Sequence, residues 1–141
     1  MEVLVSASII AILTVIGVVS YSSVNKRSRD VKRKSDMEQL RSALEMYRTG
    51  SSAYPNPNGD GVFVPVSQLS ATLVSGNYMP AIPSDPGAYG YWYQAIPTSG
   101  VYNSYCICGK LESIAGGSEQ STCTVSLDSG TTGCNYGIKN P

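Results

Sequence analysis

The chain of 141 residues contains no histidine. Histidine is the commonest general base and metal ligand at neutral pH, so a Ser–His–Asp or Cys–His catalytic site cannot form within this chain. The sequence also shows no paired-carboxylate spacing and no nucleophile elbow. We therefore expect a protein that is not an enzyme and that holds neither a cofactor nor a metal.

Charge is scarce and cancels overall, with ten Lys and Arg against ten Asp and Glu. A net charge of zero gives no general reason to expect nucleic acid as a partner. The charges are nevertheless unevenly placed. Residues 26–36 hold six basic and two acidic side chains, a net +4, whereas residues 50–141 hold two basic and five acidic ones, a net −3. A basic segment is thus joined to a mildly acidic domain.

Helix breakers are missing from the first third of the chain. No proline precedes Pro55, and Gly17 is the one glycine before Gly50. Residues 25–48 are rich in Lys, Arg, Glu, Met and Leu, which favour helices. We predict one helix from residue 2 to residue 48, about 70 Å long and capped by Gly50. Its apolar side chains in the second half fall on one stripe at about 100° per residue. They are Met37, Leu40, Leu44 and Tyr47.

Residues 3–24 carry no charge. A helix of about 20 apolar residues crosses the hydrocarbon core of a bilayer. A cleavable signal peptide would open with positive charge and have a shorter apolar core, so we predict a retained membrane-spanning helix. Its glycine marks a point of local melting or of close packing on a neighbouring helix. The residues of this span that carry the prediction are Val3, Leu4, Ile9, Ile10, Ile12, Leu13, Val15, Ile16 and Gly17.

The remaining residues change to the two-residue period of strands, interrupted by Gly- and Ser-containing turns that suit antiparallel hairpins. Strands are expected at 89–93, 105–111, 122–127 and 135–138, and a short helix at 66–75. The expected fold is therefore α+β, with a small antiparallel sheet packed on the second half of the long helix. Its parts are a membrane-spanning helix (1–24), an amphipathic continuation (25–49) and a globular head outside the cytoplasm (50–141).

Four cysteines lie in the last quarter of the chain, at positions 106, 108, 123 and 134. An even number in a small domain predicts two disulfides and an oxidising compartment. Zinc is not favoured, because the only close pair has the spacing C-x-C. Three pairings are possible. A hairpin turning near Gly116 favours Cys108–Cys123, which leaves Cys106–Cys134.

One segment resembles part of a metal loop. Residues 56–61, NPNGDG, match the front of a calcium-binding loop. Ser67 stands where such a loop needs a bidentate glutamate, so a turn stabilised by asparagine side chains is the better interpretation.

The basic run after the span and the cysteines disagree about topology. Basic residues beside a span normally remain in the cytoplasm, whereas disulfides form outside it. We give the cysteines more weight and expect a positively charged leader, removed later, to set the orientation. The basic run itself is open to four interpretations: contact with anionic lipid, pairing with neighbouring copies, binding of DNA, or a solvated helix face.

Residues 2–13, EVLVSASIIAIL, resemble the mature N-terminus of type IV pilins and pseudopilins. In that family the acid stands fifth after mostly apolar residues, and here it stands second. Residues 36–47, followed by Ala53-Tyr54-Pro55, are similar to the helix end and YP turn of major pseudopilins. The segments 82–86 (IPSDP) and 105–112 (YCICGKLE) resemble their sheet region.

The resemblance implies a structural subunit of an extracellular helical filament like a type IV pilus, with the apolar helix in the filament core. The alternatives are the major pseudopilin of a type II secretion system and a membrane-anchored binding domain that stays monomeric. Glu2 would pair with the charged N-terminus of a neighbouring copy and set the helical register. The implied partners are further copies, a prepilin peptidase and an assembly ATPase. The subunit would wait in the cytoplasmic membrane and then move to the cell surface.

Overall fold

The structure is a computed structural model that describes residues 2–59, 61–113 and 134–140. Its elements in chain order are the helix α1 (Glu2–Gly50), the strand β1 (Val64–Pro65), the 3-10 helix η1 (Val66–Leu69), the π-helix η2 (Ser70–Val74), and the strands β2 (Trp92–Thr98), β3 (Val101–Gly109) and β4 (Tyr136–Lys139). A long helix followed by an antiparallel sheet confirms the predicted α+β class.

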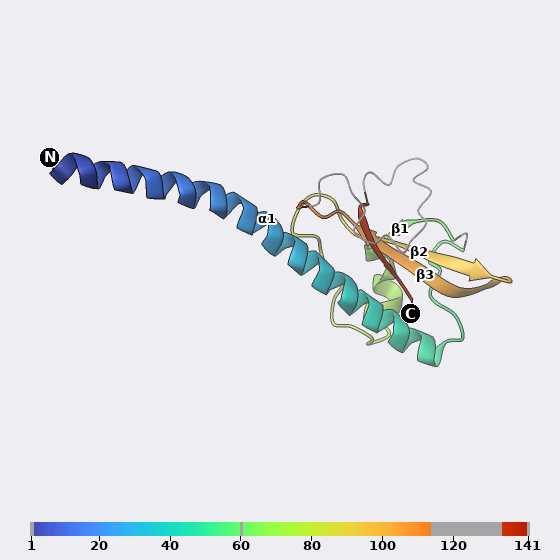
Figure 1. Ribbon diagram of the computed structural model, residues 1–141. Coiled ribbons are helices and arrows are strands. Elements are labelled where there is room, and N and C mark those ends of the chain that lie inside the picture. Colours follow the sequence, from blue (N-terminus) through green and yellow to red (C-terminus); the bar gives the residue numbers. More distant parts are fainter. Residues whose placement is uncertain (1, 60, 114–133, 141) are drawn as a thin grey trace.

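Helix α1 is continuous over 49 residues, including the predicted weak point at Gly17. Its first half projects away from the rest of the molecule, and its second half lies against the head (Figure 1). The helix ends slightly later than predicted, because Gly50 is its last residue and not a left-handed cap. The N–H of Ser51 then closes the end by donating to the carbonyl oxygens of Tyr47 and Arg48.

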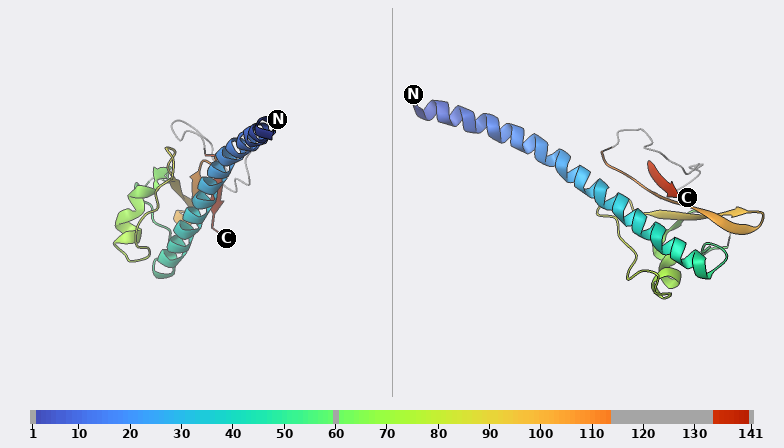
Figure 2. Two further views of the ribbon diagram at one scale, coloured as in Figure 1. Left: turned by 90° about the vertical axis from the view of Figure 1, so that its left-hand side faces the viewer. Right: turned by 60° about the horizontal axis from the view of Figure 1, so that its bottom comes forward.

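The sheet has the order β1-β2-β3-β4, and all neighbouring strands are antiparallel. The hairpin between β2 and β3 turns at Ser99 and Gly100, whose φ values of 55° and 82° suit a tight two-residue turn. The short helix predicted at 66–75 is present as η1 and η2. The strand expected at 122–127 lies outside the described residues. Two further views show the sheet, η1 and η2 gathered beside the second half of α1 (Figure 2).

The core lies between α1 and one face of the sheet. Met37, Leu40 and Leu44 on the predicted helix stripe have no exposed area, and Tyr47 packs at the edge of the same cluster. The same buried cluster includes Leu69, Leu73, Tyr93, Tyr105 and Ile107. Burial of each aliphatic side chain contributes about 1.5–3 kcal/mol, so this stripe contributes much of the attachment of the head to the helix.

The opposite face of β3 carries the cysteines. Cys106 and Cys108 point away from α1 and pack with Phe63, Trp92 and Ile96. Cys108 forms a disulfide with Cys134, with a Cα–Cα distance of 5.8 Å. This bond ties the start of the C-terminal segment to the middle of the sheet.

The predicted cysteine pairing is therefore wrong. The bond between Cys108 and Cys134 excludes both Cys108–Cys123 and Cys106–Cys134. Cys106 is also disulfide-bonded, and Cys123 lies outside the described residues. The prediction assumed that a hairpin near Gly116 supplies the neighbour of β3. The neighbour is instead β4, which follows Cys134 almost directly and runs back along β3.

Candidate functional site

The first half of α1 exposes nearly all its apolar surface. The eight large aliphatic side chains predicted for the span have exposed fractions of 53% to 80%. They are Val3, Leu4, Ile9, Ile10, Ile12, Leu13, Val15 and Ile16. A Cβ added at Gly17 would meet nothing within 4 Å. Among the described residues, α1 is the one helix long and apolar enough to cross a membrane. Apolar surface of this extent normally marks contact with lipid or with another protein.

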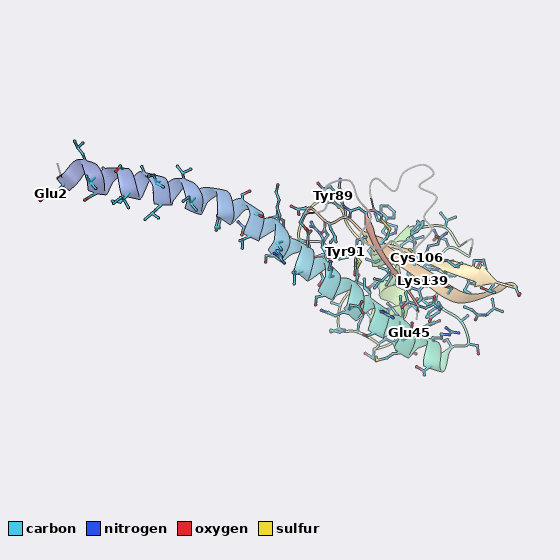
Figure 3. The ribbon with its side chains drawn as sticks, in the orientation of Figure 1. Glu2, Glu45, Tyr89, Tyr91, Cys106 and Lys139 are labelled. Atoms are coloured by element: carbon cyan, nitrogen blue, oxygen red, sulfur yellow. A yellow bond between two sulfur atoms is a disulfide. The ribbon has the colours of Figure 1, made fainter. Side chains whose placement is uncertain are left out.

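The polar residues of this half of the helix fall into two kinds. The hydroxyls of Ser6, Ser8 and Thr14 donate to carbonyl oxygens of the preceding turn at 2.7–2.9 Å, so the helix itself satisfies them. Hydroxyls that hydrogen-bond to the backbone of their own helix are compatible with an apolar environment. Glu2 is different, because it carries the only charge before Lys26. It lies at the tip of α1, far from the head (Figure 3).

A buried charge cluster fixes the other half of α1 to the head. The side chain of Arg33 has no exposed area. Its Nε lies 2.6 Å from Asp85, and its Nη1 lies 2.8 Å from both Asp30 and Glu112. Arg29 also binds Glu112 in a bidentate manner, since its Nε and Nη2 donate to the two carboxylate oxygens. The carboxylates come from α1, from the loop before β2 and from the segment after β3, so one guanidinium joins three parts of the chain.

Backbone N–H groups donate further hydrogen bonds to two of these carboxylates. Asp30 accepts hydrogen bonds from the N–H groups of Glu112 and Ser113, both at 2.8 Å. Asp85 accepts from the N–H groups of Tyr89 and Gly90 at 2.9 and 3.2 Å. We call Arg29, Asp30, Arg33, Asp85 and Glu112 the arginine cluster. Because the side chains of Asp30, Arg33 and Asp85 are buried and hydrogen-bonded on several sides, the cluster specifies one position of the head on α1.

The cluster shifts the pKa values of its carboxylates downward. The hydrogen bond from Arg29 is the main reason that the pKa of Glu112 falls to about 2. Burial alone would raise the pKa of Asp30, but hydrogen bonds from Ser113, Glu112 and Arg33 outweigh it and hold the pKa below the usual value. Burial would likewise raise the pKa of Asp85, but its hydrogen bonds, chiefly the one from Arg33, hold the pKa below the usual value.

These shifts predict how the fold responds to acid. A carboxylate whose pKa is lowered in the folded state stabilises that state above its ordinary pKa of about 4, and the effect is lost as the pH falls through the lower, folded value. We therefore expect the free energy of unfolding to decline from about pH 4 towards pH 2. Glu112→Gln should be less stable than the parent at pH 7 and should show a smaller decline. Urea unfolding followed at several pH values checks this, and parallel pH profiles for the two proteins would contradict it.

A second polar cluster lies near the C-terminal end of α1, and we call it the Glu45 cluster: Glu45, Arg48, Tyr54 and Tyr105. Glu45 accepts hydrogen bonds from the hydroxyls of Tyr54 and Tyr105 at 3.0 and 3.1 Å. Arg48 donates to the Tyr54 hydroxyl at 3.0 Å, and its guanidinium lies 4.8 Å from the centre of the same ring. The head is thus attached at both ends of its contact with α1, with the apolar core between them.

The structure changes the interpretation of the basic run. Arg33 is buried against carboxylates of its own chain, and Arg29 pairs with Glu112 while 38% of its side chain stays exposed. Arg33 is therefore not available to lipid, DNA or neighbouring copies. Lys26, Arg27 and Lys32 remain on exposed parts of α1. The arginine cluster was not predicted from the sequence, although one residue carried a signal for it. Arg33 lies four residues before Met37, in phase with the apolar stripe, which is the position of a buried residue.

An unbroken helix with an exposed apolar half and a sheet head fixed on its other half defines the class of pilin-like filament subunits. Among families, the model of "Type II secretion system (T2SS), protein G" matches residues 20–125, which are 106 of the 141 residues. The chain belongs to this family, whose members are pseudopilins and structural subunits of the secretion system. The family is the alternative named from the sequence, and it confirms the pilin-like resemblance. No curated protein and no solved structure matches the chain.

Proposed function

We propose that the chain is a pseudopilin that forms the repeating unit of a helical filament in a type II secretion system. Residues 1–24 hold each copy in the cytoplasmic membrane and later form the filament core, residues 25–49 carry the head, and residues 50–141 form that head outside the cytoplasm. The observation that carries the proposal is the apolar half of α1, exposed by 53% or more at eight positions in a chain of this family.

Hydrophobic energy alone does not drive assembly. Exchanging lipid for the helices of other copies is roughly neutral in hydrophobic energy, because lipid tails are as apolar as leucine. Close packing over many repeated contacts and the pairing of Glu2 must therefore favour the filament. A helical polymer needs two different surfaces that meet without closing a ring. A long helix that projects beyond its own head provides such surfaces.

The partners follow from the same proposal. Each copy contacts further copies of itself, and the pilin-like resemblance implies a prepilin peptidase and an assembly ATPase. A carboxylate inside hydrocarbon is costly and requires a partner. Glu2 obtains that partner when its charge meets the positive N-terminus of a neighbouring copy. The pairing also sets the register, because only one axial offset brings the two charges together.

Replacing Glu2 with glutamine tests this role. In cells that carry the assembly machinery, Glu2→Gln is expected to reduce the recovered filament by about tenfold, because the neutral amide loses the charge pairing that offsets burial of the N-terminus. Filament is measured by electron microscopy and by quantifying the sheared fraction. Ser6→Ala is the matched control, since the Ser6 hydroxyl bonds only to its own helix in the structure, and it should assemble normally.

Two results would oppose the proposal. Normal filament yield from Glu2→Gln would remove the register role. A protein that remains a monomer while residues 3–24 can be exchanged for an unrelated apolar helix without effect would indicate a membrane-anchored binding domain instead.

A further inference from the structure

Three basic side chains that closely follow the span have no ion-pair partner in the part of the chain that the structure describes. Lys26, Arg27 and Lys32 are all exposed on α1. The ion pairs of the described residues involve other basic side chains, among them Arg29 and Arg33, which both bind Glu112. We call Lys26, Arg27 and Lys32 the basic girdle.

Acidic side chains of the same chain are engaged elsewhere. Asp30 and Asp36, the two acids in the same stretch of α1, are buried against the head. The Asp36 carboxylate accepts a hydrogen bond from the Tyr91 hydroxyl at 2.8 Å. Asp30, Asp85 and Glu112 bind the guanidinium groups of the arginine cluster. These carboxylates do not neutralise the basic girdle, so its charge suits an anion from another molecule.

The basic girdle encircles α1 instead of marking one side of it. At about 100° per residue, Arg27 lies about 100° and Lys32 about 240° around the helix axis from Lys26. The widest gap between neighbouring members is therefore about 140°. A DNA duplex offers its phosphates to one side of a projecting helix and would leave part of the basic girdle unpaired. A bilayer surrounds the helix, so its headgroups meet all three side chains.

The depth of the basic girdle also matches a headgroup layer. Lys26 lies about 3 Å and Lys32 about 12 Å beyond Val24 along the helix axis. Side chains on a helix lean towards its N-terminus, which for α1 is the side of the span, so these long side chains reach back towards the bilayer. Tyr21, 70% exposed, lies just before them, where tyrosines commonly mark the membrane surface.

We propose that the basic girdle binds the headgroups of anionic phospholipids in the outer leaflet of the membrane that holds the subunit before assembly. The group recognised is the lipid phosphate, which lysine and arginine bind through charge-assisted hydrogen bonds. The inference rests on the proposed function, which places the span in a membrane, and it adds the class of lipid that surrounds the waiting subunit. It also gives a role to basic residues that lie on the side of the membrane where such residues are not usually found.

Spin-labelled lipids measure this preference. The full-length protein is reconstituted in phosphatidylcholine vesicles with a trace of spin-labelled phosphatidylglycerol or spin-labelled phosphatidylcholine. Electron paramagnetic resonance then gives the fraction of each probe that the protein immobilises. The parent is expected to favour phosphatidylglycerol about threefold, because each basic side chain near the surface favours an anionic lipid about fivefold and lipids of the other leaflet dilute the average. High salt should reduce the preference.

Three variants locate the preference. The triple variant Lys26→Gln, Arg27→Gln, Lys32→Gln is expected to lose most of it. The triple variant Lys26→Arg, Arg27→Lys, Lys32→Arg keeps every charge and should keep it. Lys139→Gln removes an exposed charge from the head and should also keep it. Because all four positions are exposed, the variants are expected to fold as the parent does.

The outcomes separate this inference from the proposed function. An inserted parent that immobilises both probes equally, or a preference that survives in the glutamine variant, would overturn the lipid site and leave the filament role standing. A parent that does not insert into the vesicles would overturn both. Fluorescence anisotropy with duplex DNA provides the remaining comparison. DNA binding that the glutamine variant loses, without any lipid preference in the parent, would assign the basic girdle to nucleic acid instead.

Discussion

Replacing Arg33 with methionine is expected to lower the free energy of unfolding by about 3–5 kcal/mol, at least a hundredfold change in the folding equilibrium. The methionine side chain is close to arginine in length and keeps good helix propensity. It removes the positive charge that Asp30, Asp85 and Glu112 share. Arg29 still contacts Glu112, but Asp85 loses its ion-pair partner in a place where its side chain is only 3% exposed. An uncompensated buried charge of this kind is among the costliest defects that one substitution creates.

The measurement is urea unfolding of the full-length protein in detergent micelles, followed by the tyrosine signal of the head. Arg27→Met is the matched control, because it makes the same substitution at an exposed position of the same helix. Its effect should stay within about 0.5 kcal/mol. A loss below about 1 kcal/mol for Arg33→Met would show that the arginine cluster contributes little to attaching the head.

Removing the disulfide with the double variant Cys108→Ala, Cys134→Ala is expected to cost up to about 3.5 kcal/mol, the chain-entropy value for a separation of 26 residues. The second disulfide, which holds Cys106, limits the loss because it still restrains the unfolded chain. The loss should be local, because Cys134 directly precedes the short edge strand β4. This strand has four residues and, in the part of the chain that the structure describes, pairs with β3. We therefore expect the disulfide to help hold its register.

Hydrogen exchange provides the local measurement. Amides of β4 should exchange at least tenfold faster in the double variant, which corresponds to about 1.4 kcal/mol of local stability. Amides in the hairpin of β2 and β3 serve as the internal control and should change little. Equal acceleration throughout the sheet would show that the disulfide stabilises the whole head, and no acceleration in β4 would show that it is not what holds this strand.

The sequence was sufficient where the signals are local. A run without helix breakers predicted α1 to within two residues of its end, and the spacing of Met37, Leu40 and Leu44 identified the face that packs on the sheet. The hairpin turn at Ser99 and Gly100 is one of the Gly- and Ser-containing turns that the sequence predicts between strands. Each of these features depends on residues within one or two turns of one another.

Pairing between residues that lie far apart in the sequence could not be predicted, because it depends on the order of the strands and loops. The bond from Cys108 to Cys134 follows from the strand order of the sheet, which no local pattern encodes. The arginine cluster depends on Asp85, which lies in a proline-containing loop with no periodicity, and on Glu112, which follows a strand. The phase of Arg33 with the apolar stripe indicated burial, but the sequence could not identify the carboxylates that compensate it.

The absence of a break in α1 between the span and the head has a geometric consequence. The head is attached to the helix by the arginine cluster, the apolar core and the Glu45 cluster, so it turns with the helix as one piece. A shift of one residue in how the buried half is seated would swing the head through about 100° around the helix axis. In the filament that we propose, a small error in the seating of the buried half would therefore produce a large displacement of the head. A misplaced copy would then be expected to clash with its neighbours, which would hinder its incorporation.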